Sequence, residues 1–423
     1  MQYYMAEVHQ YQKYLQKNKN VQNINAQNKT QVSSVKYTIL DDDVQLKSSI
    51  QQADVVCCID DELGTGSYGT IFRALDKKTN HTIIIKKINV KRSSITKFGT
   101  RNPYLIKIEK EIYIMDLCKK HPNIIKYIGY KNYNDKHNKI HNVLIYMEDM
   151  CGICVKKMTN KLNGLPLDTV KHIAQQTILG LQYMHSLNII HMDIKSDNIL
   201  YSNTGVVKII DFGEAEIVKS NNFFTLPLAG TCMYMAPELI EQLKYPEKNY
   251  ENYMSFANLG KNDIWSLGVT LCELFCGELI FTDITNQTQF NEFVKNTPEP
   301  SKNIKKFIID NLYFKISSKP DLSSDSDSEK YKKKKSSKNI YHRHVDTHDL
   351  VDLLSLIDSV PKKELIFIDF VNCCLQIDVN KRYTASRLLE HPFITAKKYS
   401  DSDKKTLLDD IINDFAKTYN TNI

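Results

Sequence analysis

The sequence predicts an α+β protein in which a small, sheet-rich lobe precedes a larger, mostly helical lobe. Apolar runs with strand character dominate the first part of the chain, whereas apolar residues at helical spacing dominate after Leu167. The chain has 423 residues, which is enough for two lobes. Strands followed by helices are typical of an α+β architecture and not of alternating parallel folds.

The first lobe is predicted from four short strands and one helix. Residues 55–59 form a strand that runs into a glycine-rich turn, and residues 70–74 and 82–86 are strand-like as well. Residues 105–118 carry apolar side chains at helical intervals, and residues 143–147 are strand-like again. The expected product is a small antiparallel sheet with one main helix.

The second lobe begins with a long predicted helix, which has an apolar stripe from Val170 to Met184. Residues 316–347 interrupt the helical pattern, since this stretch has a serine-rich, acidic run at 323–329 followed by the lysines 332–335. Such a composition cannot bury a core, so we expect a disordered insert. Apolar residues on one face predict a final helix at 404–418.

The composition is typical of a soluble globular chain, with 42% hydrophobic and 25% charged residues. The net charge of +7 owes much to the lysine run near residue 334, so we expect no specific nucleic-acid binding. The sequence has no apolar run of about 18 residues and no signal peptide at its start, so we expect no membrane span. Among ten cysteines, Cys151 and Cys154 have the spacing of a redox motif or half a zinc site. No second C-x-x-C or C-x-x-H pair completes a zinc site, so free thiols are expected.

A glycine-rich run, Gly64-Thr65-Gly66-Ser67-Tyr68-Gly69, follows the first strand. Glycines allow backbone N–H groups to approach phosphates closely. The spacing also occurs in dinucleotide-binding folds, but those require a helix after the glycines, and here a strand follows. A simple hairpin turn remains an alternative when this run is taken alone.

Lys86 ends an apolar strand and could reach phosphate oxygens as a point charge if an acidic residue oriented it. Glu111, at the inner face of the predicted helix, is the best candidate for that acid, and Glu109 is the close alternative. Taken singly, each of these charges could equally be a solvated surface group.

Four more polar residues lie between apolar runs, where they would be costly for structure alone: Asp193, Lys195, Asn198 and Asp211. Asp193 can accept a proton from a substrate hydroxyl, and Lys195 can neutralise a transferring phosphoryl group. Asn198 and Asp211 offer oxygen ligands for a metal ion. This is the chemistry that phosphoryl transfer needs, because it depends on placement and charge neutralisation.

With these residues in order, the chain resembles the eukaryotic-type protein kinase superfamily, serine/threonine branch, from about residue 55 to 394. Three more stretches match in register: Ala236-Pro237-Glu238, Asp263 to Gly268, and Arg382. The resemblance implies the bilobal protein kinase fold and the transfer of the γ-phosphoryl of ATP to a protein serine or threonine. It also implies Mg²⁺ as cofactor, with Mn²⁺ as an alternative, and a monomer that acts on a protein substrate.

The domain division that follows is an extension (1–53, partly disordered), a kinase domain (54–394) and a tail (395–423). Within the domain we expect an N-lobe (54–147), a hinge (148–152) and a C-lobe (153–394). We expect a cytoplasmic location, with a nuclear one as an alternative through Lys332–Lys335. The implied ATP-binding residues are Leu63, Gly64, Thr65, Gly66, Ser67, Tyr68, Gly69, Ile71, Lys86, Glu111, Glu148 and Met150; the catalytic residues are Asp193 and Lys195, and the metal ligands Asn198 and Asp211.

The sequence departs from the family pattern at two positions near the site. Met192 replaces the arginine that normally grips a phosphate on the activation loop, so we expect loop phosphorylation not to be the main switch. Ile84 is bulkier than the usual alanine and would crowd the adenine. The main alternative function is a pseudokinase that serves as a binding module, but it predicts loss of Lys86, Asp193, Asn198 or Asp211, and all four are present.

Overall fold

The computed structural model describes the part of the chain in which both predicted lobes lie. The extension 1–53, the insert 316–347 and the predicted helix 404–418 lie outside the described residues, so the expectations for them stay predictions. The described residues are 57–66, 69–91, 103–135, 140–218, 230–245, 258, 260–277, 287–296, 305, 308, 312 and 362–396.

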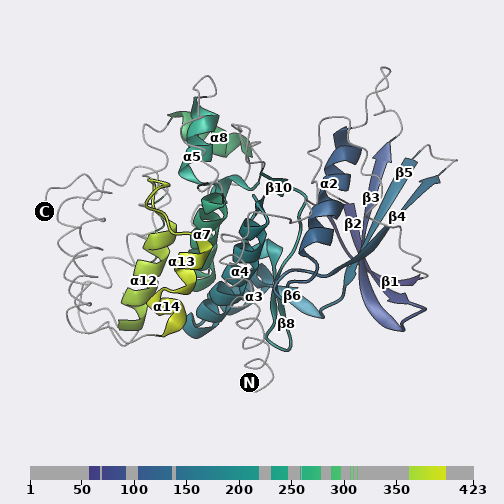
Figure 1. Ribbon diagram of the computed structural model, residues 1–423, viewed down its shortest axis with the longest axis horizontal. Coiled ribbons are helices and arrows are strands. Elements are labelled where there is room, and N and C mark those ends of the chain that lie inside the picture. Colours follow the sequence, from purple (N-terminus) through teal and green to yellow (C-terminus); the bar gives the residue numbers. More distant parts are fainter. Residues whose placement is uncertain are drawn as a thin grey trace, which may run out of the picture. The chain divides into compact units, whose positions relative to one another are not determined.

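The first lobe holds a five-stranded antiparallel sheet in the order β1-β2-β3-β5-β4. Helix α2 (Pro103–Cys118) lies beside this sheet and contacts β4 (Figure 1). Isoleucines such as Ile83 and Ile85 alternate into a small core that also includes Tyr146. The strands are β1 (Cys57–Gly66), β2 (Gly69–Asp76), β3 (His81–Lys91), β4 (Tyr127–Asp135) and β5 (Ile140–Glu148).

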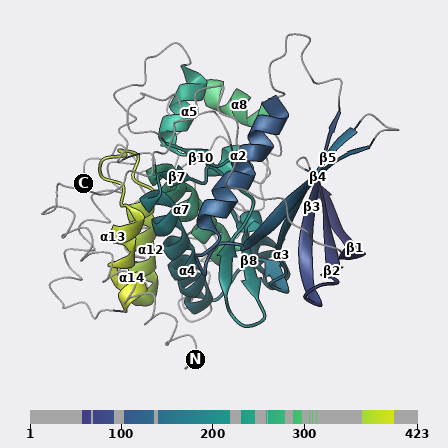
Figure 2. The ribbon, with the colours of Figure 1, turned by 45° about the vertical axis from the view of Figure 1, so that its right-hand side comes forward.

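The second lobe is mostly helical, and α4 and α12 pack against the central helix α7 (Figure 2). Residues 261–275 of α7 are all buried, so this helix forms the middle of the core. The helices are α3 (Val155–Leu162), α4 (Leu167–Ser186), α5 (Pro237–Lys244), α7 (Lys261–Cys276), α8 (Gln287–Asn296), α12 (Lys362–Cys374), α13 (Ala385–Leu389) and α14 (Pro392–Thr395).

Short strands and turns place the polar residues on the helical lobe. Strands β6, β8 and β9 form one small sheet, and β7 pairs with β10. These elements are β6 (Gly152–Cys154), β7 (Ile189–Ile190), β8 (Ile199–Ser202), β9 (Val207–Ile209), β10 (Glu216–Ile217), and the 3₁₀ turns η2 (Ser196–Asn198) and η3 (Cys232–Tyr234).

The predicted α+β class, with an antiparallel sheet and one main helix before a helical lobe, is confirmed. None of the helices in the described ranges combines the length and the apolar character that crossing a bilayer requires.

Candidate active site

The glycine-rich run forms the turn between β1 and β2. Gly64 pairs with Ile71 and Gly66 with Gly69 across the two strands. Gly69 has a φ of +130°, and a Cβ atom there would lie 2.4 Å from the carbonyl oxygen of Lys87, so the close approach requires glycine. Thr65 pairs with Thr70, Leu63 is exposed on β1, and the predicted residues Ser67 and Tyr68 lie outside the described residues.

Lys86 forms the centre of a buried charge cluster with Glu111 and Asp211. Its Nζ lies 2.7 Å from Oε1 of Glu111 and 3.0 Å from Oδ1 of Asp211. Glu111, and not the alternative Glu109, is therefore the acid that orients this lysine. The two residues differ by about 200° around the helix, so only one of them faces β3.

Burial alone would lower the pKa of Lys86, but the carboxylates of Glu111 and Asp211 outweigh burial and raise it. The pKa of Asp211 is lowered: burial raises it, but the ammonium of Lys86 outweighs this. Burial raises the pKa of Glu111, and Lys86 offsets only part of that rise. The cluster thus holds a lysine cation beside an ionised Asp211.

Adjacent antiparallel strands bring the two predicted metal ligands to one edge. Asn198 directly precedes β8 and Asp211 follows β9, while Ile210 donates its backbone N–H to the carbonyl of Asn198 at 3.0 Å. Asp211 has a φ of +61°, which is unusual for a residue other than glycine, and its side chain is 32% exposed. Strained backbone at an accessible carboxylate is typical of functional sites.

Asp193 lies at the centre of a second polar cluster. Its carboxylate accepts hydrogen bonds from Lys195 Nζ at 2.7 Å, from Asn198 Nδ2 at 2.9 Å, and from the backbone and hydroxyl of Thr231 at 2.9 and 2.8 Å. Lys195 also donates to the hydroxyl of Thr231 at 2.7 Å. Gly230 allows this approach, because a Cβ there would lie 2.2 Å from the carbonyl oxygen of Met192. The structure therefore brings Asp193, Lys195 and Asn198 together.

The loop that carries Asp193 is anchored by a residue absent from the predicted site list. Asp263, on α7, accepts the backbone N–H groups of His191 and Met192, both at 2.9 Å. Met192 has a φ of +66°, and the two hydrogen bonds compensate for that strained conformation. The sequence signal was the stretch from Asp263 to Gly268, which matches the family pattern.

The expected hinge connects β5, which ends at Glu148, to β6, which begins at Gly152. The backbone N–H of Glu148 donates to the carbonyl of Lys126 at 3.0 Å, and its side chain lies 2.5 Å from Lys208 Nζ. Met150 packs against the main core, and Ile84 lies opposite Met147 on neighbouring strands.

Comparison with known proteins identifies the family. The family model of the protein kinase domain matches residues 58–394 of the chain. The chain belongs to the protein kinase family. The chain is 37% identical over 236 residues to the serine/threonine-protein kinase pakG of Dictyostelium discoideum, covering 54% of this chain and 17% of pakG. It is 28% identical over 342 residues to the serine/threonine-protein kinase pakH of the same organism, covering 80% of this chain and 50% of pakH. The chain thus spans half or less of the length of these relatives.

The bilobal kinase fold implied by the resemblance is confirmed by this match and by the arrangement of the sheet and the helices. Glu238 and Arg382, which lie in two of the stretches that match the family pattern, form a buried ion pair. Arg382 donates to both carboxylate oxygens of Glu238, at 2.7 and 2.9 Å.

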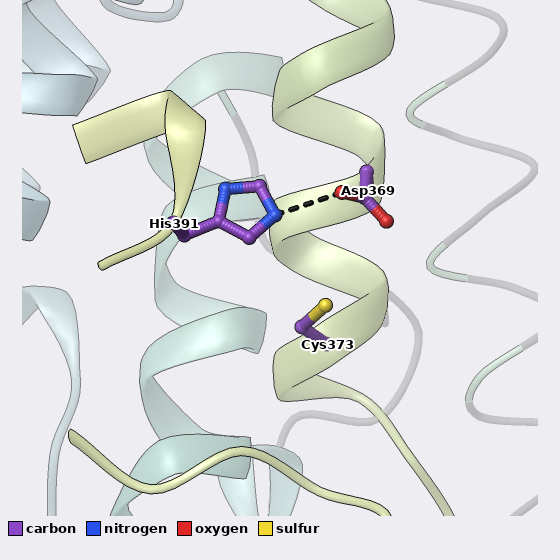
Figure 3. Close-up of side chains that lie close together, drawn as sticks. All are labelled: Asp369, Cys373 and His391. Atoms are coloured by element: carbon purple, nitrogen blue, oxygen red, sulfur yellow. Dashed lines mark hydrogen bonds and ion pairs between the residues drawn. The ribbon is translucent and has the colours of Figure 1, made fainter. Parts of the chain in front are cut away.

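A separate group of possible metal ligands lies at the far end of the kinase domain. Asp369 and Cys373 are one turn apart on α12, and His391, the residue before α14, lies close to them (Figure 3). Nδ1 of His391 accepts the backbone N–H of Phe393 at 3.1 Å, so Nε2 carries the proton and donates to Asp369 at 2.8 Å. Both ring nitrogens of His391 are therefore engaged in hydrogen bonds, and His391 caps the start of α14.

Proposed function

We propose that this kinase transfers the γ-phosphoryl group of ATP to serine or threonine hydroxyls of a protein substrate. One observation carries the proposal: Asp193, Lys195 and Thr231 form one hydrogen-bonded cluster, while Lys86 is bonded to both Glu111 and Asp211. Each network buries charge at a cost, and both bring together the residue types that phosphoryl transfer requires.

The residues present suit ATP and Mg²⁺. Asp211 offers an exposed carboxylate and Asn198 an amide oxygen, and hard oxygen ligands of this kind are what Mg²⁺ prefers. Lys86 offers a cation beside the glycine-rich hairpin, where backbone N–H groups can meet phosphates. Bound Mg²⁺·ATP would supply the phosphoryl group and neutralise its charge.

The cluster around Asp193 acts on the substrate hydroxyl and on the charge that develops during transfer. The carboxylate orients the substrate hydroxyl and accepts its proton, and Lys195 stabilises negative charge that develops nearby. Thr231 holds both side chains in place through its hydroxyl and its backbone N–H. The family members named above are serine/threonine-protein kinases, which supports the same specificity here.

The test is a phosphoryl-transfer assay with the full chain, radiolabelled ATP, Mg²⁺ and a mixture of generic protein substrates. We expect label on serine or threonine after acid hydrolysis, and its loss with Asp193→Asn. Label confined to tyrosine would contradict the specificity. ATP binding without any transfer would support the pseudokinase alternative instead.

A further inference from the structure

Two lysines on α2 reach the start of the activation segment, which we define as residues 211–238. Lys107 Nζ lies 2.6 Å from Oε1 of Glu214, and Lys110 forms a second ion pair with Glu216. The partners are 107 and 106 residues apart in the sequence, so both pairs connect the two lobes. The resemblance assigned no role to any of these four residues.

Glu214 and Glu216 lie in a part of the activation segment that is hydrogen-bonded to the helical lobe. Glu216 belongs to β10, which pairs with β7 immediately before the loop that carries Asp193. The backbone N–H of Val218 donates to the carbonyl of Asn188 at 2.8 Å. Lys107 and Lys110 of α2 therefore contact a part of the activation segment that is paired with the C-lobe.

The same helix carries Glu111, which orients Lys86. Lys107 precedes Glu111 by one helical turn and Lys110 is its neighbour, so the ion pairs hold the turn from which Glu111 projects. Lys86 lies on β3, so a shift of α2 relative to β3 would separate Glu111 from Lys86. The side chains of Glu214 and Glu216 are only 14% and 26% exposed, which limits screening of the pairs by solvent.

We propose that Lys107 and Lys110 are positioning residues, which hold α2 against Glu214 and Glu216 and so keep Glu111 bonded to Lys86 without any phosphate group. The proposal rests on the proposed phosphotransferase function and names what keeps that site assembled. It is consistent with Met192, whose buried, uncharged side chain offers a loop phosphate no cation.

The first measurement uses phosphatase-treated full chain and three variants. These are Lys107→Glu with Lys110→Glu, Glu214→Lys with Glu216→Lys, and all four exchanges together. We expect each double reversal to lower kcat about tenfold or more while KM for the protein substrate changes less than about twofold. The quadruple exchange restores the ion pairs with opposite polarity, and kcat should return to within about threefold of the unmodified enzyme.

Lys119→Glu is the control, because it reverses the charge of one lysine immediately after the end of α2. The partner of Lys119 is Asp116, at 2.6 Å and three residues away, so this pair does not connect the lobes. We expect this variant to keep kcat. A folded double reversal with undiminished kcat, or a folded quadruple exchange that stays as slow as the double reversals, would overturn the proposal.

Amide hydrogen exchange of the same proteins tests the positioning without reference to catalysis. We expect faster exchange in residues 103–118 in both double reversals and recovery in the quadruple exchange. If the unmodified chain transfers no phosphate, the proposed function fails, and the exchange pattern alone still decides whether the four charges hold α2. Equal exchange in all proteins would refute the positioning role.

Discussion

Two buried ion pairs in this protein are formed by similar residues but have different roles. Lys86 and Glu111 meet between β3 and α2 at 2.7 Å, and Arg382 and Glu238 meet in the helical lobe at the same distance. Arg382 is fully enclosed: it also donates to two backbone carbonyls and lies over the ring of Trp265. Lys86, in contrast, shares its charge with Asp211, whose side chain is one-third exposed.

This contrast indicates which buried charges can act on a ligand. Around Arg382 the neighbouring acceptors are used within the chain, so the pair connects α5 to the end of the domain and stabilises the fold. Around Lys86 the charge extends to an accessible carboxylate beside the glycine-rich hairpin. Loss of the first pair should therefore affect stability, and loss of the second should affect the rate.

The largest expected effect is on the rate, from Lys86→Met. Removal of the cation should lower kcat about a thousandfold, or ~4 kcal/mol, because the phosphates lose their oriented point charge. The fold should survive, since burial already raises the pKa of Glu111 and protonation can relieve the charge that is left. Steady-state kinetics with a parallel thermal melt checks this, and a variant that is slow only because it unfolds would refute the contrast.

The next effect is on stability, from Glu238→Gln. This change leaves the buried guanidinium of Arg382 without its carboxylate and should lower the free energy of unfolding by about 3 kcal/mol. Glu241→Gln is the matched control, because Glu241 lies exposed on the same helix, and it should cost less than about 0.5 kcal/mol. Urea denaturation measures both, and equal losses in the two variants would contradict the structural role of the Arg382 pair.

The smallest of the three effects is a pH dependence of folding stability. It arises from His121 and involves neither of the two ion pairs. Burial, aided by Lys208, lowers the pKa of His121 to about 4. The unfolded chain binds a proton near pH 6.5 and the folded chain does not, so stability is fully present above that pH and falls as the pH approaches 4. Between pH 7 and pH 5 this should cost about 2 kcal/mol.

His121→Asn tests this dependence, because an amide oxygen can replace Nδ1 as acceptor for the backbone N–H of Asn123. Urea denaturation at several pH values should show a flatter pH dependence in the variant than in the unmodified chain. An unchanged slope would assign the acid sensitivity to other groups.

Much of the site could be predicted because short stretches carry it. Glycines between two strand-like runs, and polar residues between apolar runs, indicate their placement through local periodicity alone. The order in which Lys86, Asp193 and Asp211 occur along the chain helped to predict the site for the same reason. Ser67 and Tyr68, by contrast, lie outside the described residues, so their predicted contacts stay predictions.

The α+β class, the order of the lobes and the residue types available for phosphoryl transfer could be predicted from the sequence, since these depend on local pattern. Only the tertiary structure decided that Glu111 and not Glu109 meets Lys86, and that Asp263 anchors the loop of Asp193. The pairing of the α2 lysines with Glu214 and Glu216 likewise emerged only from the fold. The physical reason is that periodicity encodes which face of an element is buried, whereas contacts between charges about a hundred residues apart depend on how the packed elements are oriented.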